Sequence, residues 1–172
     1  MPPNDAMTPP GGPRRPTSAS DFPRSGPFSL AAPVPRHAAR AIDLVLVAFP
    51  ALVYMAISTR YVQGSFEFDA PLWFPPAVFA LGSLYEFLGV VLWGRTLGKW
   101  MFGLEVVRMA DGRRPTASQA LLRAMAPWSI IALPLGVFSL PGLLIAFGSA
   151  NNGELHRGLA DHAGGTVVIS TR

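Results

Sequence analysis

Hydrophobic residues along this chain are gathered into three long blocks rather than spread evenly among polar ones. The first block, 41–58, predicts a helix over about 38–60, and the second, 72–93, predicts a helix over about 71–93. Each helix reaches the roughly 20 predominantly apolar residues that are needed to cross the hydrocarbon core of a bilayer. The pattern therefore predicts an α-helical integral membrane protein, built as a small bundle with two clear transmembrane helices.

The third block covers residues 120–148 and is interrupted by Pro127, Pro134 and Pro141. Proline kinks or breaks a helix because it has no N–H donor and its ring clashes with the preceding turn. The block is also too short for two full crossings. Two interpretations stay open, namely a single transmembrane span and a re-entrant hairpin that returns to the side from which it entered.

Two short segments outside these blocks predict β-strands, at about 103–109 and 165–170. Asp111 and Gly112 give a turn signal directly after the first of them. An isolated strand leaves a row of unpaired backbone groups, so each segment needs the other as its partner. We therefore favour a small cytoplasmic β-hairpin of these two strands, which requires the third block to return to the side where it began.

The first 35 residues have a different composition from the rest of the chain. They contain ten of the eighteen prolines. Such a segment cannot bury enough apolar surface to offset the entropy lost on ordering. Residues 1–35 are therefore predicted to be a disordered, Pro-rich cytoplasmic tail, and residues 36–172 the membrane domain.

The distribution of basic residues predicts the orientation. Six lie between the second and third blocks, namely Arg95, Lys99, Arg108, Arg113, Arg114 and Arg123. Five more precede the first hydrophobic block, whereas the loop between the first two helices contains only Arg60. Cytoplasmic loops carry the excess of Lys and Arg, so the N-terminus and the 94–119 loop are predicted to be cytoplasmic. The Arg-rich composition is typical of a GC-rich bacterial genome, which indicates the bacterial cytoplasmic (inner) membrane, crossed more than once.

Several function classes find no support in the sequence. The chain contains no cysteine, so a disulfide, a thiolate metal site and a cysteine nucleophile are excluded. The 94–99 segment is not a phosphate-binding loop, because Trp100 stands where Ser or Thr is required. With no catalytic or metal-binding pattern, we expect no enzymatic activity, no cofactor and no metal. No nucleic-acid-binding motif is present either; the expected partners are the lipid bilayer and either further copies of the chain or other membrane proteins.

Four ionisable residues fall within or beside the predicted helices, namely Arg36, Arg40, Asp43 and Glu86. Charges in a bilayer are costly and are functional hypotheses by default. The first three share one helix face, and Arg40 and Asp43 can pair at a spacing of three. Glu86 lies roughly 12 Å along its helix from Gly94, at a depth comparable to that of Asp43. The charges either anchor and stitch the helices, or form a site for ions, protons or an anionic headgroup.

The order of short motifs along residues 36–170 resembles the RDD family of bacterial membrane proteins. Its features are Arg36-His-Ala-Ala-Arg-Ala-Ile-Asp43, Gly94-Arg-Thr-Leu-Gly-Lys99, the Gly103 strand, the Leu-Leu-Arg123 opening and Asp161-His-Ala-Gly-Gly-Thr166. The resemblance implies that Arg36, Asp43 and Asp161 are the residues that act. It assigns structural roles to the other motif positions, which are Gly94, Thr96, Gly98, Lys99, Gly103, Arg123 and Thr166. Ala160 departs from the family, in which histidine often precedes the second aspartate.

The resemblance implies a multi-pass protein with a role in transport of an undefined ligand or ion, through charged residues in the cytoplasmic half of the bundle. A bundle of about three helices is small for a transporter, so this hypothesis needs a homo-oligomer or a partner. The alternative is a non-catalytic scaffold or accessory subunit for other membrane proteins. In that case the Pro-rich tail and the cytoplasmic hairpin are the working parts.

Overall fold

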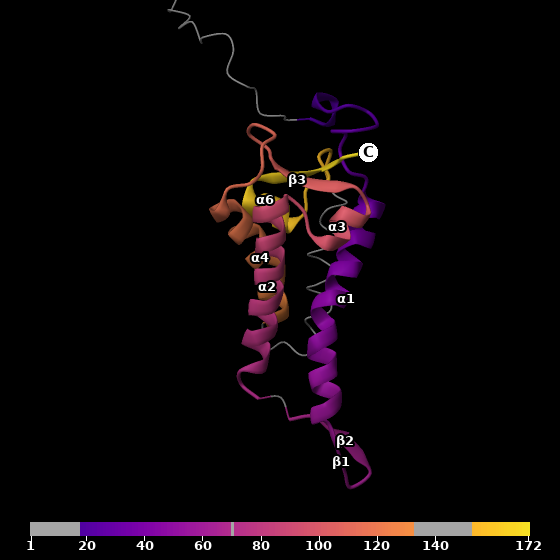
Figure 1. Ribbon diagram of the computed structural model, residues 1–172, viewed down its shortest axis with the longest axis vertical. Coiled ribbons are helices and arrows are strands. Elements are labelled where there is room, and N and C mark those ends of the chain that lie inside the picture. The colour runs from indigo at the N-terminus through magenta and orange to yellow at the C-terminus, as the bar shows by residue number, and fades with distance from the viewer. Residues whose placement is uncertain (1–17, 70, 133–152) are drawn as a thin grey trace, which may run out of the picture.

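A computed structural model describes residues 18–69, 71–132 and 153–172 (Figure 1). The described helices are η1 (Ala19–Asp21, a 3-10 turn), α1 (Pro33–Ser58), α2 (Phe74–Trp93), α3 (Leu97–Met101), α4 (Ala117–Ala132) and α6 (Leu159–Gly164). The described strands are β1 (Arg60–Val62), β2 (Ser65–Glu67), β3 (Leu104–Arg108) and β4 (Thr166–Ser170). Helices α1 and α2 run along the long axis, with β3 and β4 at one end and the β1–β2 hairpin at the other.

Helices α1 and α2 correspond to the first two hydrophobic blocks. They contain 26 and 20 residues, which at 1.5 Å per residue gives lengths of about 39 and 30 Å. Within the described part of the chain, these two helices are long and apolar enough to cross a membrane. Pro33 begins α1, a position that proline tolerates because no intrahelical N–H bond is needed there.

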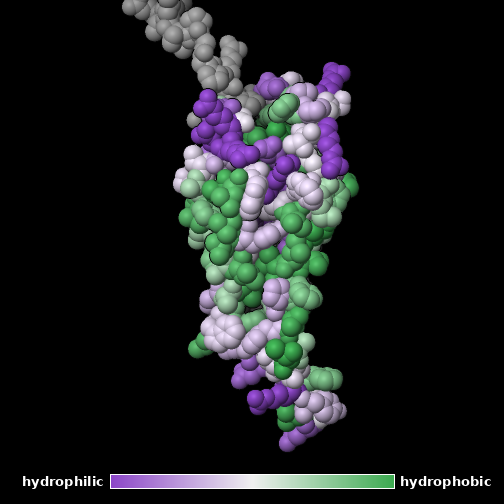
Figure 2. All heavy atoms as spheres, in the orientation of Figure 1, coloured by the Kyte–Doolittle hydropathy of each residue, from purple (hydrophilic) through white to green (hydrophobic). Residues whose placement is uncertain are grey.

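The outer surfaces of these helices suit a lipid environment. Large apolar side chains of α1 that are exposed include Val45, Phe49, Leu52 and Ile57. Figure 2 shows a hydrophobic middle zone along the molecule, with hydrophilic residues gathered at the sheet end and near the β1–β2 hairpin. An apolar band of this kind is expected where side chains face lipid instead of water.

Strands β3 and β4 form the antiparallel pair that the sequence predicts. Leu104 lies opposite Ser170, and Arg108 lies opposite Thr166. Consecutive valines of both strands are buried, so burial does not alternate along the strands. Both faces of this small sheet are therefore covered. Since α4 begins after β3 and β4 pairs with β3, the chain returns after α4 to the end of the molecule where α4 begins.

The predicted disordered tail is corrected at its C-terminal part. Leu30 forms a bridge with Ile169 of β4, and backbone N–H groups of Phe28 and Ala31 donate to carbonyls of the same strand. Residues 28–31 therefore lie along the open edge of β4 and cover backbone groups that would otherwise be unpaired. Helix α1 then begins at Pro33, earlier than expected, and residues 1–17 lie outside the described part.

The third hydrophobic block contributes α4, which packs against α2. At Gly82 of α2 an added Cβ would lie 2.3–2.5 Å from the Trp128 ring, so only glycine allows the indole this close. Pro127 is accommodated within α4. The two candidate membrane spans among the described residues are α1 and α2, and the predicted continuation of the block to residue 148 lies outside the described residues.

The β1–β2 hairpin was not predicted from the sequence. Its two-residue turn has positive φ at both Gln63 and Gly64, a backbone that matches the twist of two antiparallel strands. A cluster of four aromatic rings packs beside it, formed by Tyr54, Phe68, Trp73 and Phe74. Aromatic rings of this kind favour the boundary between lipid and water.

Candidate functional site

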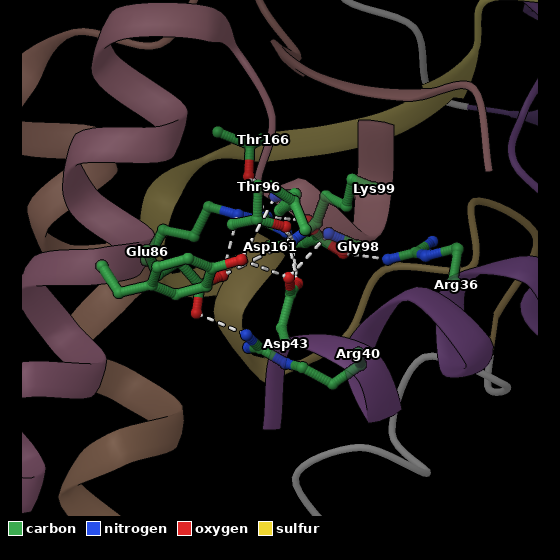
Figure 3. Close-up of polar contacts among 12 residues, drawn as sticks. Arg36, Arg40, Asp43, Glu86, Thr96, Gly98, Lys99, Asp161 and Thr166 are labelled. Atoms are coloured by element: carbon green, nitrogen blue, oxygen red, sulfur yellow. Dashed lines mark hydrogen bonds and ion pairs between the residues drawn. The ribbon is translucent and has the colours of Figure 1, made fainter. Parts of the chain in front are cut away.

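Seven charged side chains gather at the sheet end of the molecule (Figure 3). Four are cationic and three are acidic, namely Arg36, Arg40, Lys99 and Arg123 with Asp43, Glu86 and Asp161. We call them the charge cluster. The three acids are at most 1% exposed, and buried charges persist only when they are paired and hydrogen-bonded. The pairing connects α1, α2, α3, α4 and α6, which are far apart in the sequence.

Asp43 of α1 is held by the turn that follows α2. Its carboxylate accepts hydrogen bonds from the Thr96 hydroxyl at 2.6 Å, the Gly98 N–H at 2.9 Å and the Tyr85 hydroxyl at 2.7 Å. Gly98 lies so close to α1 that an added Cβ would be 2.1 Å from the Ala39 carbonyl oxygen. Asp43 therefore docks α3 onto α1, and its oxygens are occupied by three donors.

Glu86 of α2 lies at the centre of the cluster. Its Oε2 accepts a hydrogen bond from Arg40 at 2.5 Å. Among the described residues its Oε1 has no hydrogen-bond partner, and it lies 3.8 Å from both Lys99 Nζ and Arg123 Nε. In the same described part, Arg123 Nε also lacks a hydrogen-bond partner. An acceptor and donors separated by such distances leave room for a bridging water molecule.

Asp161 of α6 is the most fully bonded acid. Arg36 and Arg123 both donate to its carboxylate, as do the Gly158 N–H at 3.2 Å and the Thr166 hydroxyl at 3.3 Å. Burial would raise the pKa of Asp161, but the positive charges of Arg123 and Arg36 outweigh it and lower the pKa to about 2. The carboxylate is therefore ionised at neutral pH.

Lys99 of α3 lies between Asp43 and Glu86. Its ammonium is 3.8 Å from a carboxylate oxygen of each, and donates to the Thr96 hydroxyl at 3.2 Å. Burial lowers the pKa of Lys99 to about 8, although the nearby Glu86 opposes the shift. Lys99 is therefore the basic group of the cluster that changes its charge nearest to physiological pH.

A cavity of about 60 Å³ opens between the cationic side chains. Arg36, Arg40, Lys99 and Arg123 line it, and Asp161 is the acidic residue on its wall. A water molecule needs about 10–15 Å³ in this measure, so the cavity accommodates a few waters or a small inorganic ion. With four cations, and with one wall acid whose oxygens are already bonded, the cavity favours negative charge.

The three residues implied by the family resemblance lie in the cluster without forming a triad. Arg36 pairs with Asp161. Asp43 is reached from that pair through a chain of neighbours, from Arg123 to Glu86 and then to Lys99. The structure thus brings the three predicted residues into one cluster. Arg36 and Asp161 form one pair, and Asp43 lies apart from them and is connected through the intervening charges.

The spacing argument did not identify the partners of the helix charges. Arg40 donates to Glu86 on the neighbouring helix, whereas the spacing along α1 had only allowed a pair of Arg40 with Asp43. Asp43 accepts from Tyr85 of α2 and from Gly98 of α3. The choice of partner depends on how closely the helices approach, which a helical spacing does not contain.

The motif positions that were assigned structural roles have several different roles in the structure. Gly94 and Gly103 have φ values of +70° and +63° and make the sharp turns before and after α3. Thr96 and Thr166 donate their hydroxyls to the two aspartates. Two members of the same set, Lys99 and Arg123, carry charges of the cluster itself.

Residues that sequence reasoning missed are those that donate from outside the predicted set. Tyr85 donates to Asp43, and Gly158 donates its backbone N–H to Asp161. The signal for Tyr85 was its place next to Glu86, since a tyrosine within an apolar helix needs a partner for its hydroxyl. Ala160, the position at which the sequence departs from the motif it resembles, lines the cavity. Among the described residues, no group of three or more His, Asp or Glu side chains is arranged to hold a metal ion.

Comparison with known proteins agrees with this architecture. No curated protein and no solved structure matches the chain. The model of the RDD family matches residues 30–165, which include both long helices and every member of the charge cluster. The chain therefore belongs to the RDD family.

Proposed function

We propose that this chain is a multi-pass protein of the bacterial cytoplasmic membrane that takes part in transport, and that its charge cluster binds a small inorganic anion. The observation that carries the proposal is the cavity lined by Arg36, Arg40, Lys99 and Arg123. The four cations of the cluster outnumber its three acids by one, and a bound anion would balance this excess positive charge. The acids themselves are poor cation ligands in this arrangement, because Asp43 and Asp161 already accept several hydrogen bonds.

The cluster is proposed to face the cytoplasm. The loop between α2 and α4 contains Arg95, Arg108, Arg113 and Arg114, whereas the opposite β1–β2 end contains Arg60 with Glu67 and Asp69. This asymmetry matches the excess of basic residues on the cytoplasmic side of membrane proteins. The anion would therefore be exchanged with the cytoplasm through the sheet end.

Transport across the bilayer needs more helices than one chain supplies in the described part. The exposed apolar side chains of α1 provide a surface for further copies or for another membrane protein. We propose that the chain acts as a homo-oligomer or as a subunit beside other membrane proteins. An accessory role without transport is the second candidate, supported by the segment at residues 28–31, which lies along the edge of β4.

Chloride and inorganic phosphate are expected to raise the thermal midpoint of the purified protein in a saturable manner. A ligand that binds only the folded state stabilises it by mass action. The titration is made in detergent at constant ionic strength, with gluconate as the replacing anion. Lys99→Met is expected to remove the saturable rise, whereas Arg113→Met, which removes an exposed cation outside the cluster, leaves it unchanged.

The same titration has a pH dependence that follows from Lys99. Because its pKa is about 8, the Lys99 side chain is mainly charged below pH 8 and mainly neutral above it. The arginines remain charged throughout this range. Anion affinity should therefore fall as the pH rises from 7 to 9. A saturable rise that is the same for Lys99→Met and the unchanged protein would contradict the anion site, and a normal rise without anion flux in proteoliposomes would favour the accessory role.

A further inference from the structure

A groove on the outer surface lies where the last turns of α2 meet α3. It has a volume of about 480 Å³ and is lined largely by apolar side chains, a size within the range of small-molecule pockets. Leu88, Leu92, Trp93, Leu97 and Trp100 on its wall are 41–61% exposed. Five large apolar side chains exposed together at one place mark a surface that is covered by something apolar.

A second hollow, of about 370 Å³, adjoins the groove on the side of the sheet. The two share Arg95 and Trp100, and the second is also lined by Met101 and Arg172. The end of β4 is fixed there because the Thr171 N–H donates to the Gly103 carbonyl at 2.7 Å. An apolar groove therefore continues directly into a basic hollow.

The two arginines of the hollow lack an acidic side-chain partner in the described part of the chain. Within the ranges that the structure describes, no acidic side chain lies within ion-pair distance of either Arg95 or Arg172. The Arg172 guanidinium donates from Nη2 to the Met101 carbonyl at the long distance of 3.4 Å. Glu105, an acid of the adjacent strand, lines neither hollow. Guanidinium groups with free N–H donors are well suited to a phosphate.

We infer that this surface is a binding site for one anionic phospholipid, with an acyl chain in the groove and the phosphate between Arg95 and Arg172. The groove requires a ligand with an apolar end, and the adjoining basic hollow requires that its other end be anionic. The depth of this surface in the bilayer also suits a phospholipid, because Trp93 and Trp100 are expected to lie at the level of the lipid headgroups. A second copy of this chain is a poorer occupant, since a two-fold contact across this surface would bring arginines of like charge together.

The lipid site is separate from the proposed anion site. Its walls are formed by the end of α2, α3 and the end of β4, and none of the seven charged side chains of the cluster lines them. Tyr85 and Thr96 on the groove wall donate their hydroxyls to Asp43, so the two sites are neighbours with different lining charges. The inference does not rest on the proposed function. Its failure would leave the cavity of the charge cluster untouched.

Tryptophan quenching by lipids with brominated acyl chains tests the inference. The full chain is reconstituted in vesicles of phosphatidylcholine that contain either brominated phosphatidylglycerol or brominated phosphatidylcholine of the same chain length. We expect stronger quenching by phosphatidylglycerol. Arg95→Gln and Arg172→Gln should each lower this preference about fivefold, since one arginine near an anionic surface contributes that factor. Trp100→Phe should remove most of the quenching that depends on the headgroup.

The matched control is Arg113→Gln, which removes the same charge from an exposed turn that lines neither hollow. It should keep the preference for phosphatidylglycerol. Equal quenching by the two lipids in the unchanged protein would overturn the inference, and so would an equal loss in Arg113→Gln and Arg95→Gln. Protection of the tryptophans from both lipids, with a dimer in solution, would show that a second copy covers the groove and would also overturn it.

Discussion

Replacement of Asp161 by asparagine is expected to destabilise the protein by about 3–5 kcal/mol, because it leaves two buried arginines without their counter-charge. Arg36 and Arg123 both donate to this carboxylate. Asparagine keeps the size of the side chain but replaces one acceptor oxygen by an N–H₂ group that faces the donors. The measurement is the thermal midpoint of the purified protein in detergent, compared with that of the unchanged chain.

The matched control for this substitution is Asp111→Asn. Asp111 pairs with Arg108 at 2.8 Å on the surface, where the two side chains are 29% and 25% exposed. Exposed pairs of this kind contribute about 0–1 kcal/mol. A midpoint that falls equally in the two variants would show that the buried pairs at Asp161 do not hold the bundle together.

The contribution of Asp161 also depends on pH in a defined direction. Its folded-state pKa of about 2 lies below the ordinary value of 3.8. The stabilisation is therefore fully present above about pH 4, and it is lost as the pH falls toward 2. Asp161→Asn should remove this part of the acid sensitivity, so its midpoint should change less than that of the unchanged chain over this range.

Replacement of Gly98 by alanine is expected to separate α3 from α1. The new Cβ would lie 2.1 Å from the Ala39 carbonyl oxygen and 2.8 Å from Asp43 Oδ1. The first contact is with backbone, so the helices must move apart, and the Gly98 N–H would lose its bond to Asp43. Overpacking a core lowers the stability of a protein by about 1–3 kcal/mol. Because the neighbour here is rigid backbone, we expect a loss at the upper end of this range.

Gly89→Ala provides the control for Gly98→Ala. At Gly89 the nearest contacts of an added Cβ are 3.1–3.4 Å, with Arg95 and Thr96. Both substitutions bring the same gain of about 1 kcal/mol in helix propensity. The expected order is a marked drop in thermal midpoint for Gly98→Ala and a small change for Gly89→Ala. A midpoint for Gly98→Ala at or above that of the unchanged chain would contradict the close packing of α3 on α1.

The elements that could be predicted from the sequence are those whose pattern is local. Helices α1 and α2 are continuous apolar stretches, and their membrane length is visible without knowledge of any neighbour. The pairing of β3 with β4 could be predicted because a lone strand has no partner for its backbone groups. The β1–β2 hairpin was missed because its three-residue strands are too short to show alternation.

The site was predicted only in outline, for a physical reason. Arg36, Arg40, Asp43 and Glu86 were predicted from their places in or beside the apolar helices, and Asp161 came from the family resemblance. The partner of each charge depends on where helices cross, as the bond between Arg40 and Glu86 shows. Lys99 was assigned a structural role because a lysine in a polar loop gives no sign that it will be buried between two acids.

Cysteine labelling tests most directly the claim that the charge cluster lies at the cytoplasmic end of a protein that spans the membrane. The chain has no native cysteine, so single cysteines at Ser65, Ala110 and Ala163 can be probed with an impermeant maleimide. All three positions are exposed, the first in β2 and the other two at the sheet end. We predict that Ser65→Cys is labelled in intact cells and that Ala110→Cys and Ala163→Cys react only after the cells are opened. Labelling of Ala110 and Ala163 from opposite sides, or of either one in intact cells, would contradict this account.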